Sequence, residues 1–549
     1  MRLLIGLLLI SMLPAGSYSQ AGSPSPSTPP TQQEPKTVLK ATTRLVVVDV
    51  VATDSQGAPV TDLKESDFVV MEDGKPQRLG SFSFQGSVTK AGPPAAQLPQ
   101  NVVTNVPRSS SNSLNVVLLD RINGESNNRI YAQDRLVKFL ESGVAVEPTA
   151  IFIMEKKLTL VHDFTSDTKA LKDALNSVRP TGVSRVLGVD VAASPYATKG
   201  DFHTDENSIE ATLRSLKLLA RTLSGYPGRK NLIWVSEAFP VSLMIEGFPQ
   251  GSSLNTMIVA RQPVPGAGGQ QGLIAPGGPQ SLVLGSGKSY AEELAKIADA
   301  LMDAHVALYP VDAAGVGSAN RQAAQSNMRD MADRTGGRAF YNRNDIEVGI
   351  GSSINDGSIY YALSYYPENH VWDGHFRRIE VKTSRPDVTL RYRMGYYALN
   401  PEDSARWDSA DLAQEFTYAM EFDSPLFTGV RFQAMVTPPA DRNQKSTVIF
   451  AIDPHTMTFE NKDDGLQHVA ITCSVAVYSE KGNLIKNPKD ETTSLSGPLK
   501  PDEYQKLMRQ YFPCKRTLDL KPGKYTLRLG AVDMNSHLFG TSNASLVVP

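Results

Sequence analysis

The sequence lacks an excess of charge of either sign, has few aromatic residues and contains only two cysteines. Its 55 basic and 57 acidic residues give a formal net charge of −2. This balance argues against a nucleic-acid partner, because nucleic acids are bound by basic surfaces. Beyond residue 20, no stretch is long and apolar enough to span a bilayer. At 549 residues, the chain is expected to form roughly two to four domains.

The chain also lacks the short motifs that mark common hydrolases and metalloenzymes. It has no His-Glu-x-x-His, no Gly-x-Ser-x-Gly between a strand and a helix, and no phosphate-binding loop. His370 and His375 flank a turn, which we interpret as a solvated hairpin rather than a transition-metal site. We therefore expect a protein that is not an enzyme and has no catalytic residues.

The two cysteines, Cys473 and Cys514, both fall in the C-terminal third of the chain. In an exported protein such a pair is expected to form a disulfide. Closing a loop of this length stabilises the folded state by about 3–4 kcal/mol if the effect is chain entropy. Two buried free thiols are the alternative, since reduced cysteine packs as a small apolar residue.

The first 19 residues have the three parts of a secretory signal peptide. Arg2 supplies the positive start, an apolar core follows, and Ser17-Tyr18-Ser19 ends the segment with small residues. Residues 20–36 are rich in Pro, Ser and Gln and are predicted to be a disordered linker. We expect a secreted, periplasmic or cell-envelope protein with no membrane span in its mature form. An uncleaved N-terminal anchor is the alternative.

Strand patterns on either side of the central region suggest one shared sandwich. Residues 37–87 contain such patterns, including a hairpin signal at 73–74, but they are too few to fold alone. Residues 88–112 are rich in Pro, Gly, Ser and Asn and are predicted to be a linker. Within 357–400 the apolar period is two, as in strands. We expect the strands of 357–400 to pair with those of 37–87.

Residues 113–356 alternate between apolar runs and amphipathic segments. The runs at 114–120, 150–154 and 231–235 predict strands that are buried on both faces, with helices between them. A last strand is expected at 338–341. This α/β pattern predicts a doubly wound, mainly parallel sheet, inserted between the strands of the sandwich.

Residues 415–549 are predicted to form a separate C-terminal β-sandwich. Several strand patterns follow one another there. The turn at 520–525 precedes a strand in the way found at the corner of immunoglobulin-like sandwiches. The predicted fold class is therefore α/β plus β, ending in an immunoglobulin-like sandwich.

Five segments, in their order and spacing, resemble the von Willebrand factor A (vWA) fold. They are residues 45–50, 118–120, 226–234, 335–340 and 360–365. More narrowly, the chain resembles the acidobacterial VWFA-related exported proteins from about residue 38 to residue 400. The resemblance implies a Rossmann-like sheet and a function in adhesion or protein recognition.

The resemblance also implies a metal-ion-dependent adhesion site, with the pattern Asp-x-Ser-x-Ser, a later Thr and a late Asp. The candidate ligands of Mg²⁺ or another divalent cation in this chain are Asp120, Asn123, Ser126, Thr181, Ser184 and Glu237. Ile122 and Gly124 stand where the two serines belong, so the site is expected to be degenerate. Alternatively, Asp120 and Asn123 cap the following helix and hold the turn.

A long loop at 238–288 is predicted to leave from the same sheet edge as Asp120. It is rich in Gly and Pro and carries scattered apolar residues, which suggests a protein-contact surface or a disordered insertion. The loop at 188–206 is expected to border the same face.

We expect these loops and Asp120 to form the face of an exported binding protein that contacts a protein or another envelope or extracellular macromolecule. Two other functions stay open. One is a metal-free structural component of the cell envelope, and the other is an exported hydrolase with an unrecognised site.

Overall fold

The computed structural model describes residues 45–86, 98–107, 111, 113–124, 126–142, 147–155, 157–178, 206–237, 291–316, 322–399, 409–441, 444–462 and 464–549. The expected signal peptide (1–19), the linker 20–36 and the loop 238–288 lie outside these residues, as does almost all of the loop 188–206. None of the described helices is both long and apolar enough to cross a membrane.

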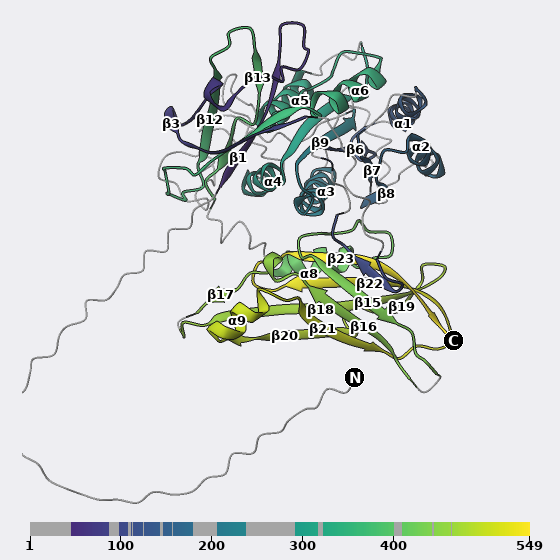
Figure 1. Cartoon of the computed structure of the whole chain (residues 1–549). Helices are drawn as coiled ribbons and strands as arrows, with labels where there is room; N and C mark the ends of the chain where they lie inside the picture. The colour runs from purple at the N-terminus through teal and green to yellow at the C-terminus, as the bar shows by residue number, and fades with distance from the viewer. Residues whose placement is uncertain are drawn as a thin grey trace, which may run out of the picture. The chain divides into compact units, whose positions relative to one another are not determined.

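A five-stranded sheet forms the centre of the α/β domain (Figure 1). Its order is β10 (Val306–Asp312), β9 (Arg229–Ser236), β6 (Ser113–Asp120), β7 (Thr149–Met154) and β8 (Leu158–Thr165). The first four strands are parallel, and β8 is antiparallel to β7. All residues of β6, β7, β9 and β10 are buried, as expected for strands covered on both faces.

Helices cover both faces of this sheet. On one face lie α1 (Ser126–Glu141), α2 (Thr168–Ser177) and α6 (Ile346–Asp356), and on the other lie α3 (Glu206–Ser224), α4 (Ala291–Asp303) and α5 (Gln322–Thr335). Neighbouring residues of β6 enter different cores, since Leu119 packs with Leu136 of α1 whereas Leu118 packs with Leu213 of α3. The predicted doubly wound, mainly parallel sheet is confirmed. The strand expected at 338–341 is wrong, because only Phe340 bridges to Val311.

The segments that flank the α/β domain in sequence pair with each other. One sheet has the order β13 (Thr389–Arg391), β1 (Val46–Thr53), β11 (Tyr360–Tyr365) and β4 (Leu79–Gln85). The other has the order β14 (Gly395–Tyr397), β12 (Phe376–Thr383), β2 (Phe68–Glu72) and β3 (Lys75–Gln77). The expected pairing of 37–87 with 357–400 is therefore present, most directly in β1 with β11 and in β2 with β12.

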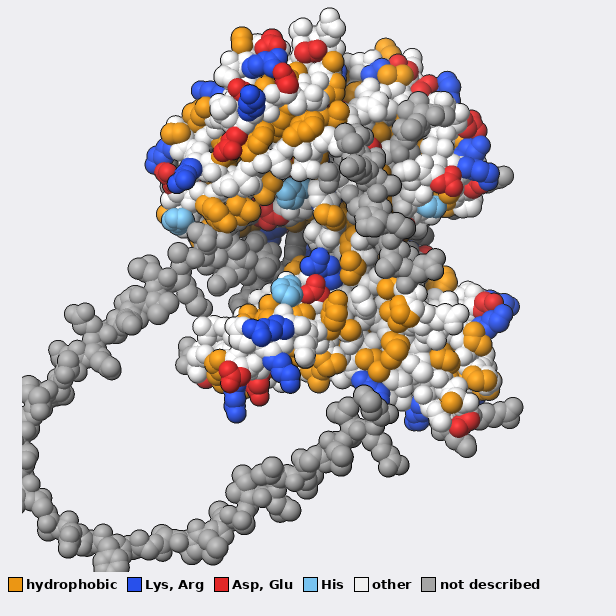
Figure 2. Space-filling model, viewed as in Figure 1, with side chains coloured by type: hydrophobic (Ala, Val, Ile, Leu, Met, Phe, Trp, Pro, Cys, Tyr) orange, Lys and Arg blue, Asp and Glu red, His pale blue; other side chains and the backbone are white. Residues whose placement is uncertain are grey.

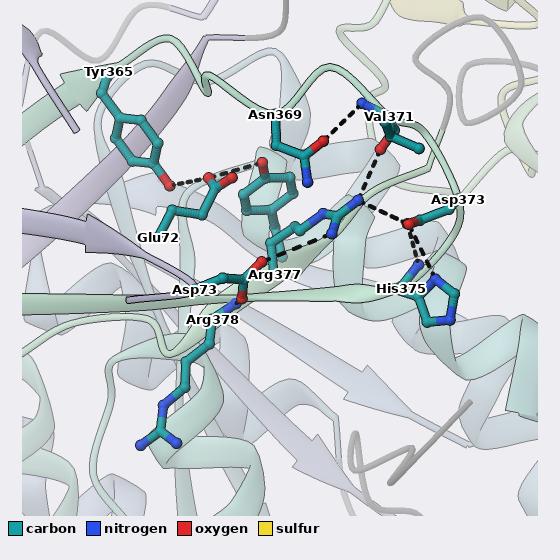
Figure 3. A network of polar contacts seen from close by, with 10 residues as sticks. Glu72, Asp73, Tyr365, Asn369, Val371, Asp373, His375, Arg377 and Arg378 are labelled. Carbon is teal, nitrogen blue, oxygen red and sulfur yellow. Dashed lines mark hydrogen bonds and ion pairs between the residues drawn. The ribbon is translucent and has the colours of Figure 1, made fainter. Parts of the chain in front are cut away.

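A polar network ties these two sheets together (Figure 3). The buried carboxylate of Glu72 accepts hydrogen bonds from the hydroxyls of Tyr365, at 2.8 Å, and Tyr396, at 3.0 Å. Nearby, the guanidinium of Arg377 donates to both oxygens of Asp373, at 3.0 and 2.9 Å, and so folds back the loop between β11 and β12. The histidine pair noted in the sequence lies in this loop.

The C-terminal region consists of two sheets around one core. The first has the order β21 (Phe512–Leu518), β16 (Ser446–Ile452), β15 (Phe432–Thr437) and β5 (Val102–Thr104). The second contains β17 (Glu460–Asn461), β18 (Gln467–Ser479), β22 (Gly523–Asp533) and β23 (Phe539–Val548), with β19 (Leu484–Lys486) and β20 (Thr492–Leu499) also paired to β18. Short helices α8 (Ser409–Ala419) and α9 (Pro501–Leu507) accompany them.

The linker predicted at 88–112 is partly wrong, because β5 lies within it and joins the C-terminal sheet through β15. Asn105 fixes this segment: its side-chain amide donates to the carbonyls of Phe427 and Val430, at 3.0 and 2.8 Å, and accepts from the amide of Phe432, at 2.8 Å. The C-terminal sandwich is thus completed by a strand more than 300 residues away in sequence, and it is not separate in the chain.

The turn at 520–525 and the two cysteines both lie in this C-terminal sandwich. The hydroxyl of Tyr525 donates to the carbonyl of Lys521 at 2.9 Å, closing the turn recognised in the sequence. Cys473 on β18 and Cys514 on β21 are both buried free thiols in the core between the two sheets. The disulfide and the immunoglobulin-like class both stay predictions.

Candidate functional site at the carboxyl edge of the parallel sheet

The strand order places Asp120 where the path of the chain through the sheet changes direction. From β6 the chain passes outward to β7 and β8, and it then returns to the other side of β6 for β9 and β10. In open α/β sheets, ligands bind at the carboxyl ends of the strands at such a switch point. Asp120 ends β6, Glu237 follows β9 and Asp312 ends β10, so three acids lie along this edge.

The carboxylate of Asp120 is occupied by hydrogen bonds from the protein itself. Its Oδ1 accepts from the backbone amides of Ile122 and Asn123, both at 2.9 Å. Its Oδ2 accepts from the Asn123 side-chain amide at 2.9 Å, the Trp234 indole at 3.1 Å and the Ser236 hydroxyl at 2.8 Å. Two carboxylate oxygens offer about four lone-pair directions, so five donors saturate them.

Burial governs the ionisation of Asp120. It raises the pKa of the carboxyl above its usual range, and the hydrogen bonds from Asn123, Ser236 and Ile122 act in the opposite direction. The donors therefore compensate only part of the cost of burying the charge. Asn123 is itself fixed, since its amide also donates to the hydroxyl of Thr212 on α3, at 2.9 Å.

Glu237 takes the space where the pattern would place a serine side chain. Gly124 has φ +154°, and a Cβ at this residue would lie 2.8 Å from Cβ and 2.9 Å from Oε2 of Glu237. Contacts that short force a shift, so the approach of Glu237 depends on glycine at this position. The hydroxyl ligand missing at Gly124 is thus replaced in space by a carboxylate from the neighbouring strand.

A guanidinium holds the turn that follows Asp120. Nη2 of Arg129, on α1, donates to the carbonyl of Gly124 at 2.6 Å and to that of Ile122 at 3.4 Å. Burial lowers the pKa of the neighbouring Arg121, the charge of Glu155 raises it, and the charge of Arg129 lowers it further. The turn is therefore surrounded by charges of both signs.

The described part of the expected metal set does not fit a magnesium ion. Mg²⁺ needs six oxygen ligands in near-ideal octahedral geometry. Both oxygens of Asp120 are saturated, and neither Ile122 nor Gly124 has a side-chain oxygen. Within the described residues, no group of three or more His, Cys, Asp and Glu could hold a metal ion. Thr181 and Ser184, and the side chain of Ser126, lie outside what the structure describes, so ligation by these three stays a prediction.

Several residues of the site were not singled out in the sequence. Trp234 and Ser236 donate to Asp120, Thr212 fixes Asn123, and Arg129 holds the turn. Trp234 and Ser236 end a buried strand beside β6, so the strand order would have indicated them. No local pattern marks Arg129, because a basic residue in the first turns of a helix is usually solvated.

No protein-family model matches the chain, and no curated protein sequence matches it. Among solved structures, it is similar to a von Willebrand factor type A protein from Catenulispora acidiphila, at 8% identity over 86% of this chain and 75% of that one, with a TM-score of 0.23. It is similar to BatB from Bacteroides thetaiotaomicron, at 10% identity over 45% and 98%, with a TM-score of 0.23. It is also similar to three N-terminal domains of the type V pili tip protein Mfa5 from Porphyromonas gingivalis, at 10% identity over 92% and 99%, with a TM-score of 0.26.

These neighbours include a protein named for the vWA domain. The narrower resemblance to the acidobacterial family stays a prediction.

Proposed function

We propose that the protein is an exported, non-enzymatic binding protein that contacts another macromolecule through the carboxyl edge of its parallel sheet. The observation that carries this proposal is the position of Asp120 and Glu237 on either side of the switch point between β6 and β9. In open α/β sheets, ligands bind in the crevice outside the carboxyl ends of the strands at the point where the strand order reverses. Export rests on the signal-like sequence at 1–19.

Exposed apolar side chains near this edge favour a protein partner. Val316, just after β10, is 61% exposed, and Ile130, in the second turn of α1, is 41% exposed. Elsewhere, charges of both signs are interspersed on the face drawn in Figure 2, and the formal net charge of the chain is −2. Apolar side chains beside a polar edge resemble the mixed composition of protein interfaces.

The test places a photo-reactive amino acid at Val316 in cells that produce the protein. Val547, which is 59% exposed on β23, is the matched control. We expect a defined cross-linked product from position 316 and none from position 547. Cross-links only from position 547 would indicate that the binding surface lies on the C-terminal sandwich. No cross-links from either position would count against a binding function.

A metal-free structural component of the envelope is the second candidate. The saturated carboxylate of Asp120 favours it, because a carboxylate with five donors has its lone pairs directed into the protein. Under this function, substitution of Val316 would change no interaction but loss of the whole protein would alter envelope integrity.

A further inference from the structure

The turn between β6 and α1 contains its own cation. A divalent ion in an adhesion site joins the strand end to the loops around it by attracting their oxygens. Here the guanidinium of Arg129 binds the carbonyl oxygens of Ile122 and Gly124. These are the two positions at which the metal-dependent pattern has serine hydroxyls, so the oxygens that Arg129 gathers come from the backbone of those same residues.

Buried cations on backbone carbonyls recur in this chain. The ammonium of Lys230 donates to two carbonyls of the turn at 226–228, at 2.6 and 2.9 Å. The guanidinium of Arg528 donates to the carbonyl of Ala419 at 2.8 Å and also to that of Pro425. Arg129, which is half-buried, makes a contact of the same kind with the β6–α1 turn.

We propose that Arg129 is a built-in cation that takes the structural place of the divalent ion, so that the β6–α1 turn folds without metal. The contact depends on the turn itself, because both carbonyls that Arg129 binds belong to the residues between Asp120 and α1. Among the described residues, the face then offers no open metal coordination position for an acidic side chain of a partner.

The first test measures thermal melting of the full chain with EDTA, Mg²⁺, Mn²⁺ or Ca²⁺, for the wild type and for Arg129→Ala. The wild-type melting temperature should be the same in all four. Arg129→Ala should melt lower by roughly 5 °C, because two carbonyls lose their donor. Millimolar guanidinium ion should restore part of this loss, since it can enter the space left by the side chain.

Arg135→Ala is the matched control. Arg135 lies on the same helix and pairs with Glu347 at 3.4 Å at the surface, so its loss should cost little and should not respond to guanidinium. The proposal is overturned if the wild type is stabilised by stoichiometric metal. It is also overturned if Arg129→Ala and Arg135→Ala melt alike or guanidinium rescues neither.

A second pair of variants covers failure of Arg129→Ala to fold. Arg129→Lys keeps the charge, whereas Arg129→Met keeps only the apolar stem. Lysine should give the higher melting temperature, and equal melting would contradict a role for the charge. These melting measurements test only the β6–α1 turn, so their outcome does not depend on the cross-linking experiment that tests the binding function.

Discussion

The α/β domain and the C-terminal sandwich each fix a loop with a fully buried cation, but with different residues. In the α/β domain, Lys230 binds two carbonyls of the turn at 226–228. In the sandwich, Arg528 binds the carbonyls of Ala419 and Pro425, which precede β15. Burial lowers the pKa of Lys230 to about 7, whereas it lowers that of Arg528 to about 10.

The contact made by Lys230 is therefore expected to respond to physiological pH, whereas that made by Arg528 is not. An ammonium is compact and strongly hydrated, so removing it from water favours the neutral amine. A guanidinium spreads its charge and stays protonated under the same burial. The two contacts can therefore be told apart by substitution and by pH.

Arg528→Met should have the largest effect. It removes the donors of two buried carbonyls, and each orphaned group costs about 1–3 kcal/mol, so we expect a loss of roughly 3 kcal/mol or more in the free energy of unfolding. Urea denaturation measures this loss, and hydrogen exchange locates it in the sandwich. Arg431→Met is the control, because Arg431 is partly exposed and its contact with Asp453 is 3.4 Å. A loss below about 1 kcal/mol would mean that Arg528 is not the anchor of this loop.

Oxidation of the cysteines should have the next largest effect, again in the sandwich. Cys473 and Cys514 lie on different sheets of the sandwich, and a bond between them would stabilise the folded state by about 3–4 kcal/mol. We expect the oxidised protein to unfold at higher urea than the reduced one. Because burial raises the pKa of Cys473, thiols should be counted after denaturation. Two free thiols in protein purified without reductant would contradict the disulfide, and a variant with alanine at both positions should be insensitive to reductant.

The pH test separates Lys230 from Arg528. Between pH 7 and 9 the unfolded chain holds a proton on Lys230 that the folded chain has released, so stability should rise with pH. The rise should be roughly 2 kcal/mol across this window, and in Lys230→Met it should be absent. Urea midpoints at several pH values measure it, with Lys138→Met as a control because Lys138 is 62% exposed. A wild-type profile as flat as that of Lys230→Met would rule out a neutral amine at this site.

The sequence predicts those parts of the fold in which apolar period and chain order agree. The short continuous apolar runs of β6 and β9 are typical of strands covered on both faces, and the period-two strands at 360–397 need partners, which 44–84 supplies. β5 could not be predicted, because three residues, Val102–Thr104, carry no period of their own. Its place is decided by Asn105, whose three hydrogen bonds depend on the folded C-terminal sandwich.

In the candidate site, too, some residues could be predicted from the sequence and others could not. Asp120 and Glu237 could be placed from strand ends alone, and Gly124 from the family pattern. The position of Arg129 could not be predicted, because the carbonyls that it binds carry no signal in the sequence. Backbone groups become ligands only when the turn has formed, so a cation that binds them is visible only in the structure.

The smallest effect concerns a buried anion, the counterpart of these cations. Glu72 accepts hydrogen bonds from Tyr365 and Tyr396 between the two sheets of the composite sandwich. Tyr365→Phe removes one donor and leaves the other, so we expect a loss of about 1 kcal/mol, measured by urea denaturation. Tyr366→Phe is the control, since Tyr366 is 57% exposed and its substitution should change nothing. Tyr365→Phe could instead lower the free energy of unfolding as much as Arg528→Met does. Hydroxyl donors would then stabilise the buried carboxylate of Glu72 as strongly as the guanidinium of Arg528 stabilises the carbonyls that it binds. A formal positive charge would in that case not explain the stability of these buried contacts.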